Sequence, residues 1–322
     1  MRLFLLPLLL SLCRFVASSY DANLARSIFF PLAAAAYSSD TDARHACLSL
    51  VGLSDNFSVE TYEGSCDLQK NNCSMIVVRD DLTKIIAVAY RGSSPAQIGL
   101  ETVVGGNLVP WRDSEQVGDY FKFAFESHDM QDGYQRLLSI VISPFFPDYK
   151  VYISGHSLGG ALGTLAASQL LKDFPEVKTR LLMYNYGTPR VGNEAFASSL
   201  NGLLENHFRV VNAADIVPHL PPLEFLGFPS FFVHAGEEVW FSSGVCHGEP
   251  KLSKKDTADS GSNILEKNIM DLKAQDHPFY FSTPSRLQDW GVLGCPNISC
   301  LGCWSGHARL SPASLEPSPP SV

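Results

Sequence analysis

The stretch Tyr149–Leu171, YKVYISGHSLGGALGTLAASQLL, decides the fold class of this chain. It begins as an apolar, β-branched run typical of a buried strand, and from Leu158 onward it is rich in alanine and leucine, as helices are. A tight turn between a strand and a helix accepts only small flanking side chains, which Gly155 and Gly159 provide around Ser157. The stretch therefore predicts a nucleophile elbow, with the Ser157 hydroxyl at the N-terminus of a helix.

Strand-like and helix-like segments alternate on both sides of this elbow. We expect strands over 74–78, 84–90, 180–186 and 208–212, and helices over 22–37, 131–142 and 193–204. The polar residues 79–83 join the first two strands and predict a hairpin. Pro31 predicts a boundary or a kink in the first helix. The alternation indicates an α/β protein with a mostly parallel central sheet flanked by helices.

Composition excludes some classes of protein. The chain has 322 residues, 45% of them hydrophobic and only 18% charged, so it can bury a large core and is not disordered. Its 24 basic and 33 acidic residues give a formal net charge of −9. Because no concentrated basic surface is available to neutralise phosphates, we expect no nucleic-acid partner.

The N-terminus has the parts of a secretory signal peptide. Arg2 precedes an uncharged apolar run over 3–10, and small residues stand at Ala17 and Ser19. Arg14 interrupts the apolar stretch far short of the roughly 20 residues that a membrane span needs. We therefore expect cleavage near Ser19, a secreted extracellular protein and no transmembrane segment.

This interpretation divides the chain into three parts. Residues 1–19 are the expected signal peptide, residues 20–303 one globular domain, and residues 304–322 a disordered tail rich in proline and serine. N-x-S sequons agree with the secretory route and predict a glycoprotein. They lie at Asn56, Asn72 and Asn297.

The cysteines predict disulfides, because secreted proteins keep them oxidised. Loss of the signal peptide leaves Cys47, Cys66, Cys73, Cys246, Cys295, Cys300 and Cys303. Cys66 and Cys73 can clip a hairpin, and Cys47 can link to the cluster at 295–303. That cluster also suggests zinc, but it has one nearby imidazole and no second ligand pair, so disulfides are favoured over a metal. The odd number leaves at least one thiol free or paired with another chain.

Ser157 needs a base to take its proton and a carboxylate to orient that base. In this fold class the carboxylate and then the histidine follow the serine along the chain. Asp215 comes just after the strand expected at 208–212, which places its carboxylate at the edge of the sheet. Among the histidines, His277 precedes an aromatic run that can anchor its loop, and His234 is the second candidate.

An oxyanion hole needs two backbone N–H donors. The N–H of Leu158, directly after the nucleophile, supplies one. We expect the other from the loop Arg91–Ser94, which follows a strand and contains Gly92 for close backbone approach.

Five motifs in order resemble the fungal-type class 3 lipases. They are YRGSS at Tyr90–Ser94, GHSLGG at Gly155–Gly160, YGTPRVGN at Tyr186–Asn193, NAADIVP at Asn212–Pro218, and Asp276-His277 followed by Tyr280-Phe281. Their spacing and the FPLAAAAY of Phe30–Tyr37 resemble the secreted animal branch of the family, especially that of nematodes. The resemblance covers residues 20–281 and implies an α/β-hydrolase fold.

The resemblance also implies roles for individual residues. Ser157 is then the nucleophile, Asp215 the orienting acid and His277 the base. Ser93 and Leu158 are the implied oxyanion donors. His234 falls instead in the family's strand segment around residues 232–240, so His277 is preferred as the base. No cofactor or metal is expected.

The chain departs from the fungal pattern in two places. Residues 95–106 stand where the fungal enzymes carry a lid with a tryptophan, and here no tryptophan occurs before Trp111. Apolar residues in that segment can still make transient contact with a lipid surface. The family often has a second cysteine after the one at 246, which this chain lacks, so Cys246 is the candidate for the odd thiol.

The sequence therefore predicts a secreted serine hydrolase that cleaves acyl esters of lipids through an acyl-enzyme, similar to triacylglycerol lipases. A second hypothesis stays open, because the lid is altered and residues beyond Phe281 have no clear family counterpart. The chain would then be a catalytically impaired, lipid-binding secreted glycoprotein that retains the hydrolase fold.

Overall fold

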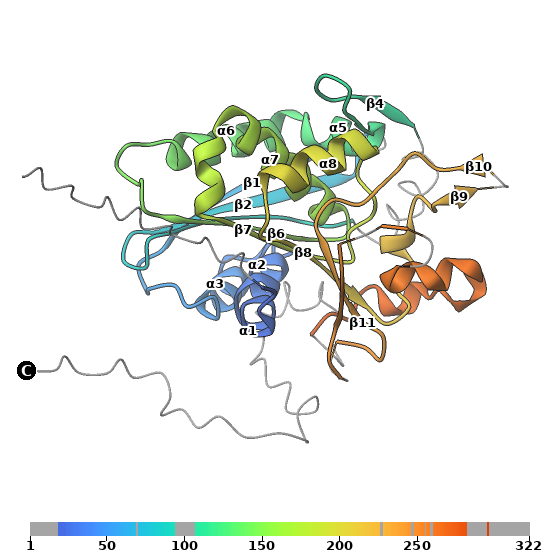
Figure 1. The fold of residues 1–322 in the computed structure, drawn as a ribbon. Helices are drawn as coiled ribbons and strands as arrows, with labels where there is room; N and C mark the ends of the chain where they lie inside the picture. The colour runs from blue at the N-terminus through green and yellow to red at the C-terminus, as the bar shows by residue number, and fades with distance from the viewer. Residues whose placement is uncertain are drawn as a thin grey trace, which may run out of the picture.

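The computed structural model is built on a sheet of eight strands, with helices on both faces (Figure 1). It describes residues 19–68, 70–93, 107–225, 228–245, 248–254, 256–257, 260–281 and 295. The strand order is β1 (Ser58–Ser65), β2 (Asn72–Asp80), β3 (Ile85–Tyr90), β6 (Lys150–His156), β7 (Leu181–Tyr186), β8 (His207–Asn212), β11 (Glu237–Phe241) and β12 (Lys251–Ser253).

The five strands from β3 to β11 are parallel to one another, and β1, β2 and β12 add antiparallel strands at the two edges. The predicted α/β-hydrolase arrangement is confirmed. Two small hairpins lie outside this sheet: β4 (Leu108–Pro110) pairs with β5 (Gln116–Gly118), and β9 (Glu224–Phe225) pairs with β10 (Phe228–Pro229).

The helices form a layer on each side of the sheet (Figure 1). One layer contains α5 (Asp119–Phe125), α6 (His128–Val141), α7 (Leu158–Asp173) and α8 (Glu194–Leu203), and the other contains α1 (Ala22–Leu24), α2 (Phe30–Ala35) and α3 (Thr41–Ser49). The expected hairpin of β2 and β3 and the expected helices α6, α7 and α8 are all present. The edge strand β1 and the helices α3 and α5 were not expected from the sequence.

The first expected helix contains an irregular turn directly before Pro31. Residues Ala25–Phe29 form a π-helical turn between α1 and α2. Proline has no N–H to donate, and its ring clashes with the carbonyl four residues earlier in a regular α-helix. A wider turn at this point accommodates both effects, so the helical path continues past Pro31.

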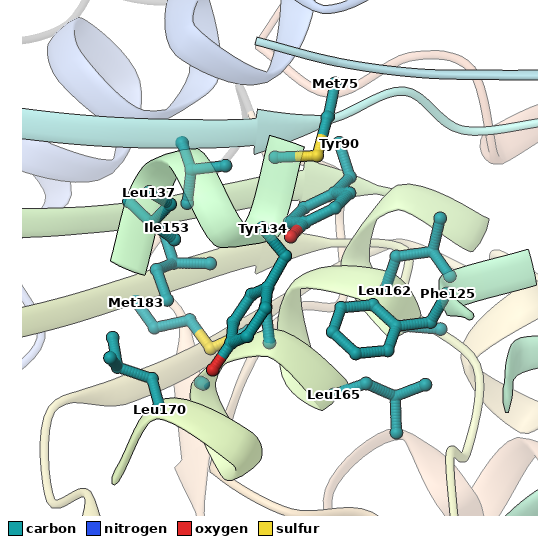
Figure 2. Close-up of a cluster of buried hydrophobic side chains, with 14 of the residues drawn as sticks. Met75, Tyr90, Phe125, Tyr134, Leu137, Ile153, Leu162, Leu165, Leu170 and Met183 are labelled. Atoms are coloured by element: carbon teal, nitrogen blue, oxygen red, sulfur yellow. The ribbon is translucent and has the colours of Figure 1, made fainter. Parts of the chain in front are cut away.

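The larger core lies between the sheet and the layer of α5, α6 and α7 (Figure 2). Strands β3, β6 and β7 contribute Tyr90, Ile153 and Met183, and all three side chains are fully buried. They pack against side chains of the helices, among them Tyr134 and Leu162 (Figure 2). Each fully buried aliphatic side chain of this kind stabilises the fold by about 1.5–3 kcal/mol. The core therefore fixes β6 and α7 relative to each other, and with them the turn at Ser157.

Two predicted disulfides are confirmed, Cys47–Cys295 and Cys66–Cys73. The first ties helix α3 to a residue near the C-terminal end of the chain, and the second closes the loop between β1 and β2. Cys246, Cys300 and Cys303 lie outside the described residues. So do residues 1–18 of the expected signal peptide, the segment 95–106 and the expected tail.

Removing the longer disulfide is expected to destabilise the protein more than removing the shorter one. The paired cysteines are 248 residues apart in one case and 7 in the other. On the chain-entropy model, closing loops of these lengths adds about 5 kcal/mol and about 2 kcal/mol, respectively, to the free energy of unfolding. Urea unfolding of Cys47→Ser/Cys295→Ser and of Cys66→Ser/Cys73→Ser measures both losses in free energy of unfolding. The opposite ranking would contradict the prediction.

Candidate active site

Ser157 occupies the turn between β6 and α7 with φ 59° and ψ −131°, a backbone conformation that is strained for a residue with a side chain. The flanking glycines make this turn possible. A Cβ on Gly155 would collide with the backbone of Gly159, and a Cβ on Gly159 would lie 2.8 Å from the carbonyl carbon of Tyr90. Ser157 is buried and directly precedes the first residue of α7, at the position where the sequence predicts an elbow.

The structure brings Ser157, His277 and Asp215 together from three distant parts of the chain. The Nε2 atom of His277 lies 2.8 Å from the Ser157 Oγ. On the other side of the ring, Nδ1 lies 2.9 Å from Oδ2 and 3.1 Å from Oδ1 of Asp215. His277 and Asp215 are buried, so little water competes for these contacts.

The electrostatics of Asp215 determine which nitrogen of His277 carries the proton. Burial alone would raise the pKa of this carboxyl, but the neighbouring His277 ring and the hydrogen bonds that Asp215 accepts lower it below its ordinary value. Asp215 is therefore ionised at neutral pH and can only accept a hydrogen bond. It follows that His277 donates from Nδ1–H, which leaves the lone pair on Nε2 to accept the Ser157 hydroxyl proton.

Asp215 has two further hydrogen-bond donors that hold its carboxylate. Tyr280 donates its hydroxyl to Oδ2 at 2.5 Å, and the backbone N–H of Val217 donates to Oδ1 at 2.9 Å. Burial and the adjacent carboxylate raise the pKa of Tyr280 well above its ordinary value, so its hydroxyl stays protonated. Tyr280 was read from the sequence only as part of an aromatic run, because a partner 65 residues away leaves no local pattern.

The loops that carry Asp215 and His277 are joined to each other by hydrogen bonds. The Asn212 side chain donates to the carbonyl oxygens of Asp276 and Phe279 at 3.0 and 2.9 Å. The carboxylate of Asp276 accepts the N–H of Ala214 at 3.0 Å. Asp276 therefore fixes the loop before Asp215.

The predicted oxyanion donors lie next to Ser157. Leu158 is the first residue of α7 and is buried. Across the site, a Cβ on Gly92 would lie 3.1 Å from the Cβ of Ser157, so the loop that carries Gly92 and Ser93 passes directly beside the nucleophile. Ser93 is buried as well.

His234, the second candidate for the base, lies elsewhere. Its Nε2 atom contacts the carbonyl oxygen of Pro218 at 2.7 Å, and its backbone N–H donates to Asp256. Burial and the positive charge of Arg209 lower the pKa of His234 well below its ordinary value. His234 therefore supports the segment that follows Asp215, and His277 is the histidine in contact with the serine.

His156 contributes to the site in a way that the sequence did not indicate. In the structure its ring stacks on the ring of His277, with centroids 4.4 Å apart, and it also contacts the hydroxyl of Tyr37. The only sequence signal for this role is that His156 directly precedes Ser157.

This arrangement can perform one kind of chemistry. A buried hydroxyl, an imidazole and an ionised carboxylate in line are suited to nucleophilic attack on a carbonyl carbon with proton transfer through the histidine. Within the described part of the chain, no group of three or more potential metal ligands comes together. None of the helices described there has the length and hydrophobicity needed to span a bilayer.

The chain is similar in sequence to known lipases. Residues 87–225 match the model of the family "Lipase (class 3)". The chain is 26% identical to Lipase ZK262.3 of Caenorhabditis elegans, over 88% of this chain and 86% of that protein. It is 32% identical to a lipase of Rhizomucor miehei, over 64% of this chain, but it spans only about half of that protein, 54%.

A solved structure extends the similarity to three dimensions. It is described as a triacylglycerol lipase whose catalytic centre is formed by a serine protease triad. It is 26% identical to this chain, with a TM-score of 0.64, and the match covers 81% of this chain and 94% of that structure. The likeness therefore extends over most of both chains.

Proposed function

We propose that this chain, whose residues 87–225 match the model of the class 3 lipases, acts as a triacylglycerol lipase-like serine hydrolase through Ser157, His277 and Asp215. The observation that carries these roles is the pair of contacts on His277, 2.8 Å to the Ser157 Oγ and 2.9 Å to Asp215 Oδ2. Such an arrangement supplies a nucleophile, a base and an orienting carboxylate in one line.

In the proposed reaction, the Ser157 Oγ attacks the ester carbonyl carbon while its proton moves to Nε2 of His277. The N–H groups of Ser93 and Leu158 stabilise the negative charge on the carbonyl oxygen, and Asp215 stabilises the imidazolium. The carbon–oxygen bond to the alcohol then breaks, and His277 returns the proton to the leaving alkoxide. Water attacks the acyl-enzyme by the same path, which releases the fatty acid and restores the Ser157 hydroxyl.

The competing hypothesis is a lipid-binding protein that keeps this fold without catalysis. The short contact between His277 and Ser157 favours the enzyme, because lipid binding has no need for an aligned base. A fluorophosphonate probe separates the two hypotheses. We expect stoichiometric labelling of the purified protein at Ser157, located by peptide mass spectrometry. A protein that binds medium-chain acylglycerol emulsions but takes up no probe would support the binding function instead.

We further propose that the protein is secreted, with residues 1–19 as the signal peptide, 20–303 as the enzyme domain and 304–322 as a tail. The two disulfides support this route, because the cytosol keeps most thiols reduced. A Fusarium solani relative, 36% identical over 120 residues that make up 33% of that protein, is itself described as a secreted mono- and diacylglycerol lipase. The proposed substrate is a lipid ester met at an oil–water or membrane surface, with transient contact through apolar residues.

Secretion from a eukaryotic cell is expected to produce a chain that starts near residue 20 and carries N-linked glycans at Asn56 and Asn72. Both asparagines are exposed, so the sequons are accessible on the folded protein. Edman sequencing locates the cleavage site, and treatment with a peptide N-glycosidase should convert both asparagines to aspartates, which mass spectrometry detects. Asn56→Gln and Asn72→Gln are the matched controls, and an unchanged mass after treatment would contradict the prediction.

A further inference from the structure

We propose that Tyr37 and His156 form a positioning pair that holds the loop of His277 and the loop of Ser93 against the turn at Ser157. The inference rests on the proposed esterase function and adds two residues to its machinery. Neither residue is expected to touch the substrate. Both act on the reaction through the backbone and the ring that they hold in place.

His156 is the link between the elbow and the base. It is the last residue of β6 and is completely buried. Its Nε2 atom lies 2.9 Å from the backbone carbonyl oxygen of His277, and its ring stacks on the His277 ring at an interplanar angle of 29°. One side chain therefore fixes both the backbone position and the ring plane of His277.

The contacts of His156 define its protonation state. A carbonyl oxygen only accepts hydrogen bonds, so Nε2 of His156 must carry the proton that it donates to His277. Burial and the neighbouring His277 lower the pKa of His156 to about 3, so the ring is neutral and Nδ1 has a free lone pair. The Tyr37 hydroxyl lies 2.8 Å from this Nδ1 and therefore donates to it.

A neutral ring in this position suits the proposed reaction. His277 becomes an imidazolium when it takes the proton of Ser157. A positive charge on the His156 ring, whose centroid lies 4.4 Å from that of the His277 ring, would oppose that step. The Tyr37 hydroxyl favours the Nε2–H form of His156, because only this form offers Nδ1 as an acceptor. The pair thus keeps the hydrogen bond to the His277 carbonyl intact.

Tyr37 also contacts the loop of the oxyanion donors. It follows the helical segment that ends with α2, in a part of the chain far from the other site residues. A Cβ on Gly92 would collide with the Tyr37 hydroxyl and with the carbonyl oxygen of His156. The hydroxyl therefore lies where Gly92, the turn at Ser157 and the support of His277 meet.

The test is the replacement Tyr37→Phe, which removes one oxygen and keeps the ring. On a soluble short-chain ester we expect kcat to fall on the order of 10-fold, which corresponds to one buried hydrogen bond, with KM unchanged. Tyr134→Phe is the matched control. Tyr134 is fully buried in the core of Figure 2, and its hydroxyl has no hydrogen-bond partner among the described residues. Its replacement should leave kcat and KM as they are.

A double-mutant cycle and a conservative variant distinguish positioning from packing. In a His156→Leu background, Tyr37→Phe should lower kcat much less than in the wild type, because its hydrogen bond to the His156 ring is already absent. His156→Gln can both accept from Tyr37 and donate to the carbonyl of His277, so it should retain more of kcat than His156→Leu. Isotope-edited NMR of the imidazole nitrogens should show a neutral His156 protonated at Nε2, with part of this population lost in Tyr37→Phe.

These outcomes separate the inference from the proposed function. If the wild-type protein neither hydrolyses esters nor takes up the fluorophosphonate probe, the proposed function fails, and the positioning role fails with it. If the wild type is active but Tyr37→Phe behaves like Tyr134→Phe, only the positioning pair is wrong. A fall in melting temperature with kcat unchanged would likewise assign Tyr37 and His156 to stability alone.

Discussion

Ser157→Ala is expected to lower the kcat for ester hydrolysis by about 10⁴- to 10⁶-fold and to abolish fluorophosphonate labelling. The variant lacks the Oγ atom that lies 2.8 Å from Nε2 of His277, so no acyl-enzyme can form. The strained turn accepts alanine as readily as serine, because both carry a Cβ at the same position. Initial rates on a medium-chain ester, with a circular dichroism melt of the same sample, measure the effect.

Ser154→Ala is the matched control for this substitution. Ser154 lies on the same strand, is completely buried and donates its hydroxyl to the carbonyl oxygens of Phe29 and Tyr184. We expect a lower melting temperature with kcat close to that of the wild type. Substantial hydrolysis by Ser157→Ala, with a stability equal to that of the wild type, would disprove the proposed mechanism.

Asp215→Asn is expected to lower kcat by about 10⁴-fold while the fold is retained. The amide of asparagine can donate to Nδ1 of His277, which would move the ring proton to Nε2. A His277 protonated at Nε2 cannot accept the proton of Ser157, so the base is lost even though every side chain stays in place. Ester hydrolysis across pH 6 to 9, compared with the wild type, measures the change.

The control for this second prediction removes a donor to the same carboxylate. Tyr280→Phe deletes the hydroxyl that donates to Oδ2 but leaves Asp215 and its contacts with His277 and Val217 intact. We expect the loss of kcat to be on the order of 10-fold, far smaller than that of Asp215→Asn. An Asp215→Asn enzyme as active as Tyr280→Phe would show that the carboxylate does not orient the base.

Much of this fold is predictable from local patterns in the sequence. The run that forms β6, the alanine- and leucine-rich α7 and the glycines around Ser157 each have a short-range signature, so the elbow could be inferred with its residues. The hairpin of β2 and β3 follows from the polar turn between two β-branched runs. The edge strand β1 lacks such a signal, because its residues other than Val59 and Tyr62 are charged, polar or glycine, and none of them is fully buried.

The site is less predictable than the fold, because its contacts connect distant residues. Asp215 and His277 follow from chain order and from resemblance to a family, and the structure adds their distances to Ser157. Tyr37 meets His156 across 119 residues, and Tyr280 meets Asp215 across 65. No periodicity or local spacing encodes such pairs, and each depends on the tertiary packing of separate layers.

The N-terminal helical segment has a consequence for how the protein is made. The carbonyl oxygens of Ala25 and Phe29 accept hydrogen bonds from Tyr186 and Ser154, which follow them by 161 and 125 residues. At ordinary rates of translation, roughly 6–30 s pass before those partners are synthesised. During that interval Phe29, Phe30 and Leu32, all completely buried in the finished protein, have no sheet to cover them. The nascent chain therefore carries an apolar segment that can be covered by its native partners only after β6 and β7 have been synthesised.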